Sequence, residues 1–233
     1  MRNTLKIGLA VTLLASGLGG CTYEGSGTDN PIGRKAVWLS FLAGEDIKQA
    51  CQPGAADHSR VVYNGRWEEQ VRIYEWGGKE PRPLEQRVIG PADLSHFGIN
   101  LDAIAAPWAG TTAKTELSAA QLAAINGALG KSLHASPPPV GEHFPSDAFY
   151  WVAASCQGGV FAFNAWEFGT PRYAEVGFDQ PLLAADHTGV AFNPPHLFDS
   201  LDLSNKPRAD RQRWYVEIRA DGLTGSTSFN QPP

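Results

Sequence analysis

The sequence has few positive charges, few cysteines and no long apolar segment. Lys and Arg total 19 against 24 Asp and Glu in 233 residues, and the formal net charge is −5. Nucleic-acid binding depends on clustered Lys and Arg that neutralise phosphates, so this composition argues against a nucleic-acid partner. It argues equally against a membrane patch of basic residues. No run reaches the roughly 20 apolar residues that a membrane-spanning helix needs.

Glycine and tryptophan, in contrast, are plentiful. The chain has 25 glycines and seven tryptophans, and 42% of its residues are hydrophobic. Aromatic residues favour strands and glycines favour turns, while ordinary hydrophobic content allows the chain to bury a core. The composition therefore predicts a globular domain in which strands outnumber long helices.

The first twenty residues are typical of a secretory signal peptide. Arg2 and Lys6 precede an apolar stretch from Ile7 to Leu18, and small residues follow up to Cys21. The ending Leu18-Gly19-Gly20-Cys21 resembles the lipobox of bacterial lipoprotein precursors. The resemblance implies cleavage before Cys21, acylation of that cysteine and attachment of the mature chain to a membrane. The alternative is an ordinary secretory signal in which Cys21 falls by chance.

The resemblance covers the leader alone, and no family is recognised for residues 22–233. In lipoproteins of this kind an aspartate after the cysteine favours the inner membrane, whereas this chain has Thr22. The resemblance therefore implies the outer membrane, with the protein facing the periplasm. We expect a signal peptide at 1–20, a flexible tether at 21–33, because its residues are small and polar, and one β-rich domain at 34–233.

Asp147 to Phe168 is expected to form the centre of the fold. Two aromatic-rich apolar runs flank Ser155-Cys156-Gln157-Gly158-Gly159, a pattern that predicts a β-hairpin with glycines in the turn. Both faces of each run are apolar, whereas a strand exposed on one face would alternate with polar residues. The hairpin is therefore predicted to lie in the middle of a sheet.

Cys51 and Cys156 are the cysteines that remain after lipidation of Cys21. In an oxidising compartment such a pair predicts a disulfide. Closing a loop of this length stabilises the fold by roughly 4–5 kcal/mol on entropic grounds, and often by less. A redox pair or a catalytic thiol is the alternative, but the sequence lacks a C-x-x-C spacing.

The helix predicted most firmly spans 118–129. Ser118 and Gln121 form a capping box, Leu122, Ile125 and Leu129 form an apolar stripe, and Gly130 suits the helix end. Further helical turns are expected at 45–51, 92–97 and 101–106. Strands are expected at 36–42, 84–89, 172–178, 211–220 and 223–229, together with a hairpin over 61–75 that turns at Asn64-Gly65. The pattern predicts an α+β, β-dominated fold: an antiparallel sandwich or barrel with helix 118–129 packed on it.

No pattern in the sequence indicates a metal or a cofactor. His134 and His143 are nine residues apart, as are His187 and His196, whereas known metal motifs use tighter spacings. Nucleophile motifs such as G-x-S-x-G and S-x-x-K are absent from the sequence. The Gly-Gly pairs at 77–78 and 158–159 lack a phosphate-binding pattern. We therefore expect neither a metal site nor a cofactor.

Three carboxylates after the central hairpin are the candidates for catalysis. Glu167 lies between Trp166 and Phe168, and Glu175 and Asp179 follow. Aromatic neighbours raise the pKa of a carboxyl group by desolvation, and a glycosidase needs two carboxyl groups about 5–10 Å apart. The simpler interpretation is that Glu167 points outward at the open end of the hairpin.

Aromatic side chains on strands suggest a binding surface instead. Trp67, Tyr74, Trp76 and Tyr215 are placed where an exposed row could stack on sugar rings or on a protein partner, although core packing explains such residues equally well. We expect a non-enzymatic, lipid-anchored binding or assembly module, with an envelope protein or glycan as partner. The alternatives are a hydrolase of an envelope polymer and a passive spacer. A concave pocket with converging ionisable groups would favour the hydrolase, and an aromatic patch would favour the module.

Overall fold

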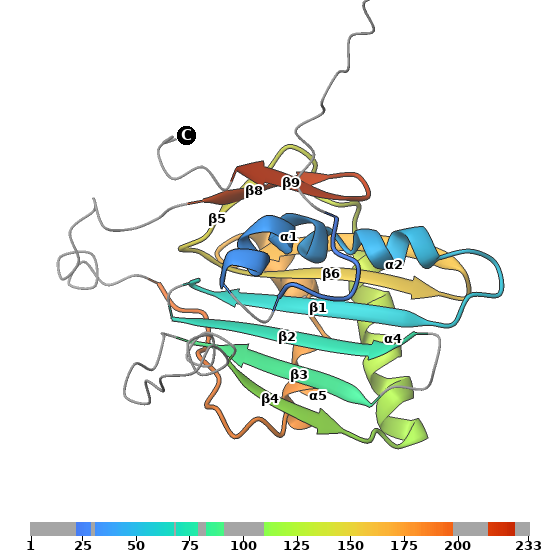
Figure 1. The fold of residues 1–233 in the computed structure, drawn as a ribbon. Coiled ribbons are helices and arrows are strands. Elements are labelled where there is room, and N and C mark those ends of the chain that lie inside the picture. The colour runs from blue at the N-terminus through green and yellow to red at the C-terminus, as the bar shows by residue number, and fades with distance from the viewer. Residues whose placement is uncertain are drawn as a thin grey trace, which may run out of the picture.

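A six-stranded antiparallel sheet forms the centre of the protein, and elements cover both of its faces (Figure 1). The computed structural model describes residues 22–28, 31–67, 69–78, 83–90, 110–197 and 214–226. The helices are α1 (Pro31–Ala43), α2 (Glu45–Ala50), α4 (Ala119–Ala135), the 3-10 helix η2 (Pro171–Glu175) and α5 (Asp179–Ala184). The strands are β1 (His58–Gly65), β2 (Gln70–Gly77), β3 (Leu84–Ile89), β4 (Thr111–Thr115), β5 (His143–Pro145), β6 (Phe149–Gln157), β7 (Val160–Glu167), β8 (Tyr215–Arg219) and β9 (Gly222–Ser226).

The large sheet has the strand order β4-β3-β2-β1-β6-β7, and a small sheet has the order β5-β8-β9. Every strand pair is antiparallel. The α+β, β-dominated fold predicted from the sequence is confirmed. Of the two predicted architectures the protein adopts the sandwich, because β4 and β7 are the two edges of an open sheet rather than neighbours in a closed barrel.

Each face of the large sheet has its own hydrophobic core. Helices α1 and α2 and the small sheet pack on one face, which we call the α1 face. Helices α4 and α5 pack on the other, the α4 face. Along β6, Val152 contributes to the first core and Trp151 to the second, and their exposed fractions are 1% and 0%. Covering both faces explains why the strands of the central hairpin are apolar on both sides.

The central hairpin is confirmed as β6 and β7, but its two strands occupy different positions. Strand β6 lies between β1 and β7, as an interior strand should, and Phe163 of β7 is buried. Strand β7, however, is an edge of the sheet, and Val160 at its start is 66% exposed. The prediction of an interior position is therefore right for β6 and wrong for β7.

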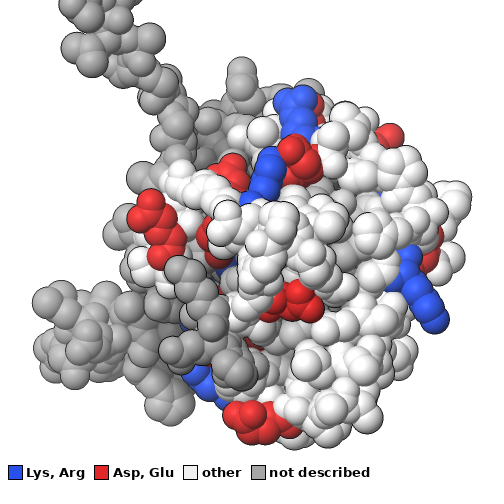
Figure 2. Space-filling view, turned by 90° about the vertical axis from the view of Figure 1, so that its right-hand side faces the viewer, with Lys and Arg blue, Asp and Glu red and all other residues white. Residues whose placement is uncertain are grey.

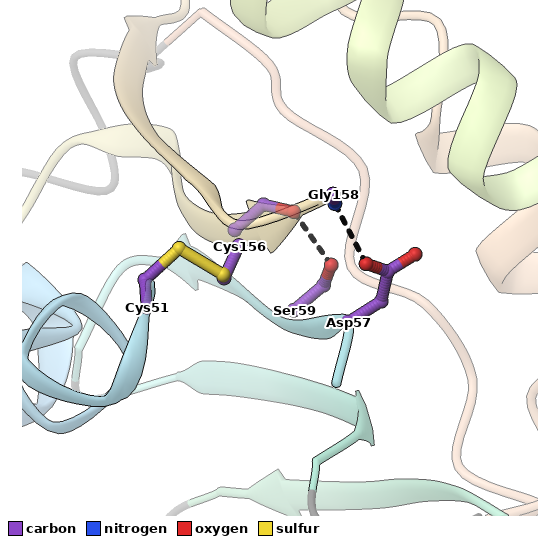
Figure 3. Close-up of a disulfide and its surroundings, with 6 residues drawn as sticks. Cys51, Asp57, Ser59, Cys156 and Gly158 are labelled. Carbon is purple, nitrogen blue, oxygen red and sulfur yellow. Dashed lines mark hydrogen bonds between the residues drawn. A yellow bond between two sulfur atoms is a disulfide. The ribbon is translucent and has the colours of Figure 1, made fainter. Parts of the chain in front are cut away.

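The predicted disulfide joins the residue after α2 to β6 (Figure 3). The Cα atoms of Cys51 and Cys156 are 5.6 Å apart, within the range that a disulfide requires. Beside it the hydroxyls of Ser59 and Ser155 form a 2.7 Å hydrogen bond between β1 and β6 (Figure 3). The disulfide therefore fastens the end of α2 to β6, an interior strand of the sheet.

Residues 36–42, predicted as a strand, belong to helix α1. Val37, Trp38, Phe41 and Leu42 are buried, whereas Ala36 is exposed. This spacing of one and four residues is helical, and a short apolar run does not by itself distinguish a buried helix from a strand. Gly44 then separates α1 from α2 with φ 65°, and a Cβ there would lie 2.2 Å from the Cβ of Ala154.

The hairpin predicted over 61–75 is present as β1 and β2, but its turn falls later than predicted. Asn64 and Gly65 belong to β1 and pair with Val71 and Gln70. Among the described residues of the turn, Arg66 has a positive φ, at 62°. Asn64 serves another purpose, since its amide donates hydrogen bonds to two carbonyl groups before β6, those of Ser146 at 3.0 Å and Ala148 at 2.6 Å.

Helix α4 begins as predicted and ends later. Both hydrogen bonds of the capping box between Ser118 and Gln121 are present. The helix passes through Gly130 to Ala135, and its buried apolar residues are Ile125, Leu129 and Leu133. Leu122 is 38% exposed, so the predicted stripe is displaced by one turn.

Residues 172–178 were the other wrongly predicted strand. They contain most of η2, which begins with Pro171 at its first position, and lead into α5. The strands predicted at 84–89, 211–220 and 223–229 correspond to β3, β8 and β9. The helical turns predicted at 92–97 and 101–106 lie outside the described residues.

Candidate binding cleft

A cleft of about 690 Å³ lies on the α1 face, over β2, β3 and β4. In Figure 1, α1 and α2 lie over β6, while β3 and β4 extend beyond these helices. The lining combines the N-terminal segment 22–28, α2 and the three strands, and it includes Tyr23, Asp46, His58, Glu75, Glu85 and Lys114.

Arg60 of β1 organises the wall of the cleft. Its side chain is 1% exposed, and all five of its N–H groups are used. The guanidinium donates two bonds to Asp46 at 2.8 Å, two to Glu75 at 2.9 and 3.2 Å, and one to the carbonyl of Phe41 at 3.0 Å. It also lies 4.0 Å from the centre of the Phe41 ring. Arg60 therefore binds the end of α1, the start of α2 and β2 together.

Glu75 is ionised throughout the neutral range. Burial opposes its ionisation, but the hydrogen bond from His58 and the charge of Arg60 outweigh this and lower its pKa to about 2. The distance from His58 Nε2 to Glu75 Oε1 is 2.8 Å. A carboxylate in this state accepts hydrogen bonds, but it is a weak base and does not donate a proton at neutral pH.

The far rim of the cleft, on β3 and β4, carries charges of both signs. Lys114 and Glu85 form a 2.8 Å ion pair whose side chains are 67% and 42% exposed. Arg87 donates a 3.4 Å hydrogen bond to Thr28 across the rim. The Glu85–Lys114 pair is exposed and adds little stability.

The N-terminal segment forms the near wall. Tyr23 is 7% exposed, and its backbone N–H donates to the Ser40 hydroxyl at 2.9 Å. Its ring stands edge-on against Phe41 with 4.9 Å between ring centres, and burial raises the pKa of Tyr23 to about 12. The carbonyl of Thr28 accepts a 2.9 Å bond from Arg34. The flexible tether predicted over 21–33 is therefore not observed in the described part of that range, where Tyr23 is anchored and α1 begins at Pro31.

The predicted catalytic carboxylates are separated by the sheet. Glu167 ends β7 on the α1 face, two residues after the buried Ala165. Glu175 lies on the α4 face, where its carboxylate accepts bonds from Ser136 at 2.8 Å and Trp166 at 3.2 Å. Asp179 begins α5, on that same face. Glu167 is thus not paired with either of the other two.

The predicted row of exposed aromatic residues does not form. Tyr74 and Trp76 are 0% and 3% exposed and lie in the core of the α4 face. Tyr74 donates a 2.7 Å hydrogen bond to Asp186, and Trp76 donates one of 2.9 Å to Asn126. Only Trp67 and Tyr215 are half-buried, and Trp67 packs against other aromatic residues, with 5.1 Å between its ring centre and that of Trp214.

The four histidines considered as ligands lie in separate surroundings. His187 contacts the Thr115 hydroxyl at 3.1 Å, His143 packs against Tyr215, and His196 packs against Phe149. His134 lies in the last turn of α4. Among the residues that the structure describes, no group of three or more His, Cys, Asp or Glu is placed to hold a metal ion.

A second buried arginine lies on the opposite face, and sequence reasoning missed it as it missed Arg60. The side chain of Arg72 is 1% exposed and is paired with Asp186. It also donates to the carbonyl of Val190 and, at 2.8 Å, to Gln70. These contacts hold residues 186–193 over the α4 face. The only signal in the sequence was a positive charge inside an otherwise strand-like run.

The outer surface offers no strongly charged region on the side that Figure 2 displays. There the acidic and basic side chains of the described residues are scattered among uncharged ones, without a continuous patch of one sign (Figure 2). Among the described helices, none has the length and apolar character needed to cross a membrane. No family model matches the chain, and neither a curated protein nor a solved structure matches it.

Proposed function

We propose that this protein is a lipid-anchored, non-enzymatic binding module of the bacterial cell envelope, and that the cleft over β2–β4 holds its ligand. The lipobox resemblance at Leu18 to Cys21 supports the anchor and, with Thr22 after the cysteine, a place at the outer membrane facing the periplasm. The disulfide between Cys51 and Cys156 supports an oxidising compartment, since such bonds persist outside the reducing cytosol.

The state of Glu75 is the observation that carries the binding role. A general acid or base works best when its pKa lies near the working pH, whereas the pKa of Glu75 is lowered to about 2. All five N–H groups of the Arg60 guanidinium already donate hydrogen bonds to protein atoms. The wall is therefore held by hydrogen bonds and ion pairs within the protein, which favours recognition of a polar ligand over proton transfer.

The ligand class follows from the lining of the cleft. Carboxylates, a histidine, a lysine and threonine lie beside Phe41 and Ile73. Charges of both signs fit a ligand that carries both signs or none, such as a glycan or a short peptide of the envelope. The modestly acidic composition argues against nucleic acid as this partner.

Two experiments test the proposal. Radiolabelled palmitate should enter the wild-type protein and not Cys21→Ala, and equal labelling of the two would contradict the anchor. Binding isotherms with peptidoglycan fragments and envelope polysaccharides should then saturate for the wild type. Thr112→Trp, which places a large ring at an exposed position of the cleft, should weaken binding at least tenfold. The matched control is Ala123→Trp on the exposed side of α4, and flat isotherms across the whole panel would refute the binding role.

One observation favours a second candidate, hydrolysis of an envelope polymer. Burial raises the pKa of Glu167, and the nearby charge of Glu142 raises it further. A carboxyl group with a raised pKa suits a general acid. Release of reducing sugar or peptide from envelope polymers by the wild type, and its loss in Glu167→Gln, would establish this activity in place of the non-enzymatic role.

A further inference from the structure

We propose that Tyr23 makes the lipid anchor a short, fixed junction, which holds the cleft at the membrane surface. This inference rests on the acylation of Cys21 in the proposed function. It adds that the domain does not hang from a long tether and that the cleft meets the polar headgroup layer of the bilayer.

The contacts of Tyr23 fix where the chain leaves the domain. The ring is packed edge-on against Phe41 and lies 4.9 Å from the guanidinium carbon of Arg60. Its backbone N–H is bonded to the Ser40 hydroxyl, which in turn donates to Glu45 at 2.9 Å. Tyr23 is thereby attached to α1, α2 and β1, so it moves with the body of the protein.

The length of chain beyond Tyr23 then limits how far the membrane lies from the domain. A fully extended chain spans about 3.3–3.6 Å per residue, so the two residues of chain from Tyr23 back to position 21 can reach at most about 7 Å. A free tether over 21–33 would instead allow a separation of about 40 Å. The two arrangements differ by roughly the diameter of a small domain.

The cleft lies at this junction. Tyr23, Glu24 and Gly25 are part of its lining, so its near wall stays close to the acylated residue however the domain rotates about residues 21 and 22. On the opposite rim the Glu85–Lys114 pair presents both signs of charge. A surface of this kind needs no anionic lipid, and vesicles of phosphatidylcholine alone should suffice to observe the arrangement.

Fluorescence quenching in such vesicles tests the inference. The lipidated full-length protein is reconstituted into phosphatidylcholine vesicles that contain a lipid with a nitroxide on its headgroup. A thiol-reactive fluorophore is attached at Thr112→Cys, on the far side of the cleft, or at Ala123→Cys on α4, on the opposite face of the sheet. Both positions are exposed. We expect quenching at residue 112 to be at least threefold stronger than at residue 123.

A linker variant separates the junction from the anchor. Ten Gly and Ser residues inserted after Thr22 should reduce the quenching at residue 112 to the level at residue 123, while palmitate labelling is unchanged. Equal quenching at the two positions in the labelled, uninserted protein would overturn the fixed junction and leave the anchor intact. Persistence of the difference in the linker variant would overturn it too. A protein that takes up no palmitate would instead refute the anchor on which the inference rests.

Discussion

Arg60 and Arg72 lie on neighbouring strands, are equally buried and face opposite sides of the same sheet. Arg60 is held by Asp46 and Glu75, and both of these carboxylates line the cleft. Arg72 is held by Asp186 and the carbonyl of Val190, under residues that cover the α4 face. The chemistry of burial is the same in both places, but the two carboxylates that hold Arg60 also line the cleft.

The contrast shows which buried charges indicate a site in this fold. Burying an ion costs several kcal/mol unless close partners compensate, so each arginine requires nearby carboxylates. On the α4 face the compensating group comes from a connecting segment that closes over the sheet. On the α1 face the compensating carboxylates come from α2 and β2, and both line the cleft that extends over β3 and β4. The α1 face, which carries the cleft, is therefore the better candidate for binding a ligand.

Removing either arginine is the most severe way to test this comparison. Arg60→Met leaves two carboxylates without their cation, and Arg72→Met leaves one. We expect Arg60→Met to lower the free energy of unfolding by about 3–5 kcal/mol, and Arg72→Met to lower it by somewhat less. Denaturant unfolding measures both, with the exposed Lys114→Met as a control that changes stability by at most about 1 kcal/mol. An effect of Arg60→Met no larger than that of the control would contradict the role of Arg60.

Removing the disulfide should affect only one side of the comparison. Cys51 directly follows α2, which carries Asp46. The double substitution Cys51→Ser, Cys156→Ser should therefore weaken the contacts between α2 and Arg60. We expect a loss of about 2–4 kcal/mol in stability. Hydrogen exchange should become faster in α2 and stay unchanged in 186–193. Faster exchange in both regions would mean that the two faces are not independent.

Acid should weaken the pairing of Arg60 with Glu75, because it protonates the Glu75 carboxylate. Its pKa falls from 4.5 to about 2 on folding, so its contribution is present above pH 4.5 and is lost as the pH falls towards 2. A shift of this size corresponds to roughly 3 kcal/mol. Glu75→Gln should therefore remove part of the pH dependence of stability between pH 4.5 and 2. Unfolding curves measured across that window in the wild type and the variant should converge at the acid end, and parallel curves would contradict the assignment.

Local signals in the sequence were sufficient for part of the fold. The glycines at 158–159, the capping box at Ser118 and the cysteine pair each act through neighbouring residues or a general rule, and each was predicted. Helix α1 was mistaken for a strand because its apolar run is short, and the register in which Trp38 and Phe41 share a buried face becomes evident only once the partner surface is known.

The cleft could not be predicted in the same way. Tyr23, Asp46 and Glu75 belong to three segments that only the folded sheet brings together. The sequence pattern places Glu75 in a hairpin strand and Tyr23 in a tether, and neither placement indicates a shared site. A shifted pKa in a concave site does not by itself indicate an enzyme, because the direction of the shift matters. The pKa of Glu75 is lowered, which moves it further from neutral pH. Glu167, with the shift in the other direction, lies apart from Glu175 and Asp179.

The bond between Cys51 and Cys156 makes the intervening chain a closed covalent ring, with 105 residues from one sulfur-bearing position to the other. Strands β1 to β4, helix α4 and β5 all belong to that ring. A protease that cuts once anywhere within 52–155 opens the ring without releasing a fragment. The nicked protein would keep its full mass on a non-reducing gel and separate into two pieces only when reductant is added.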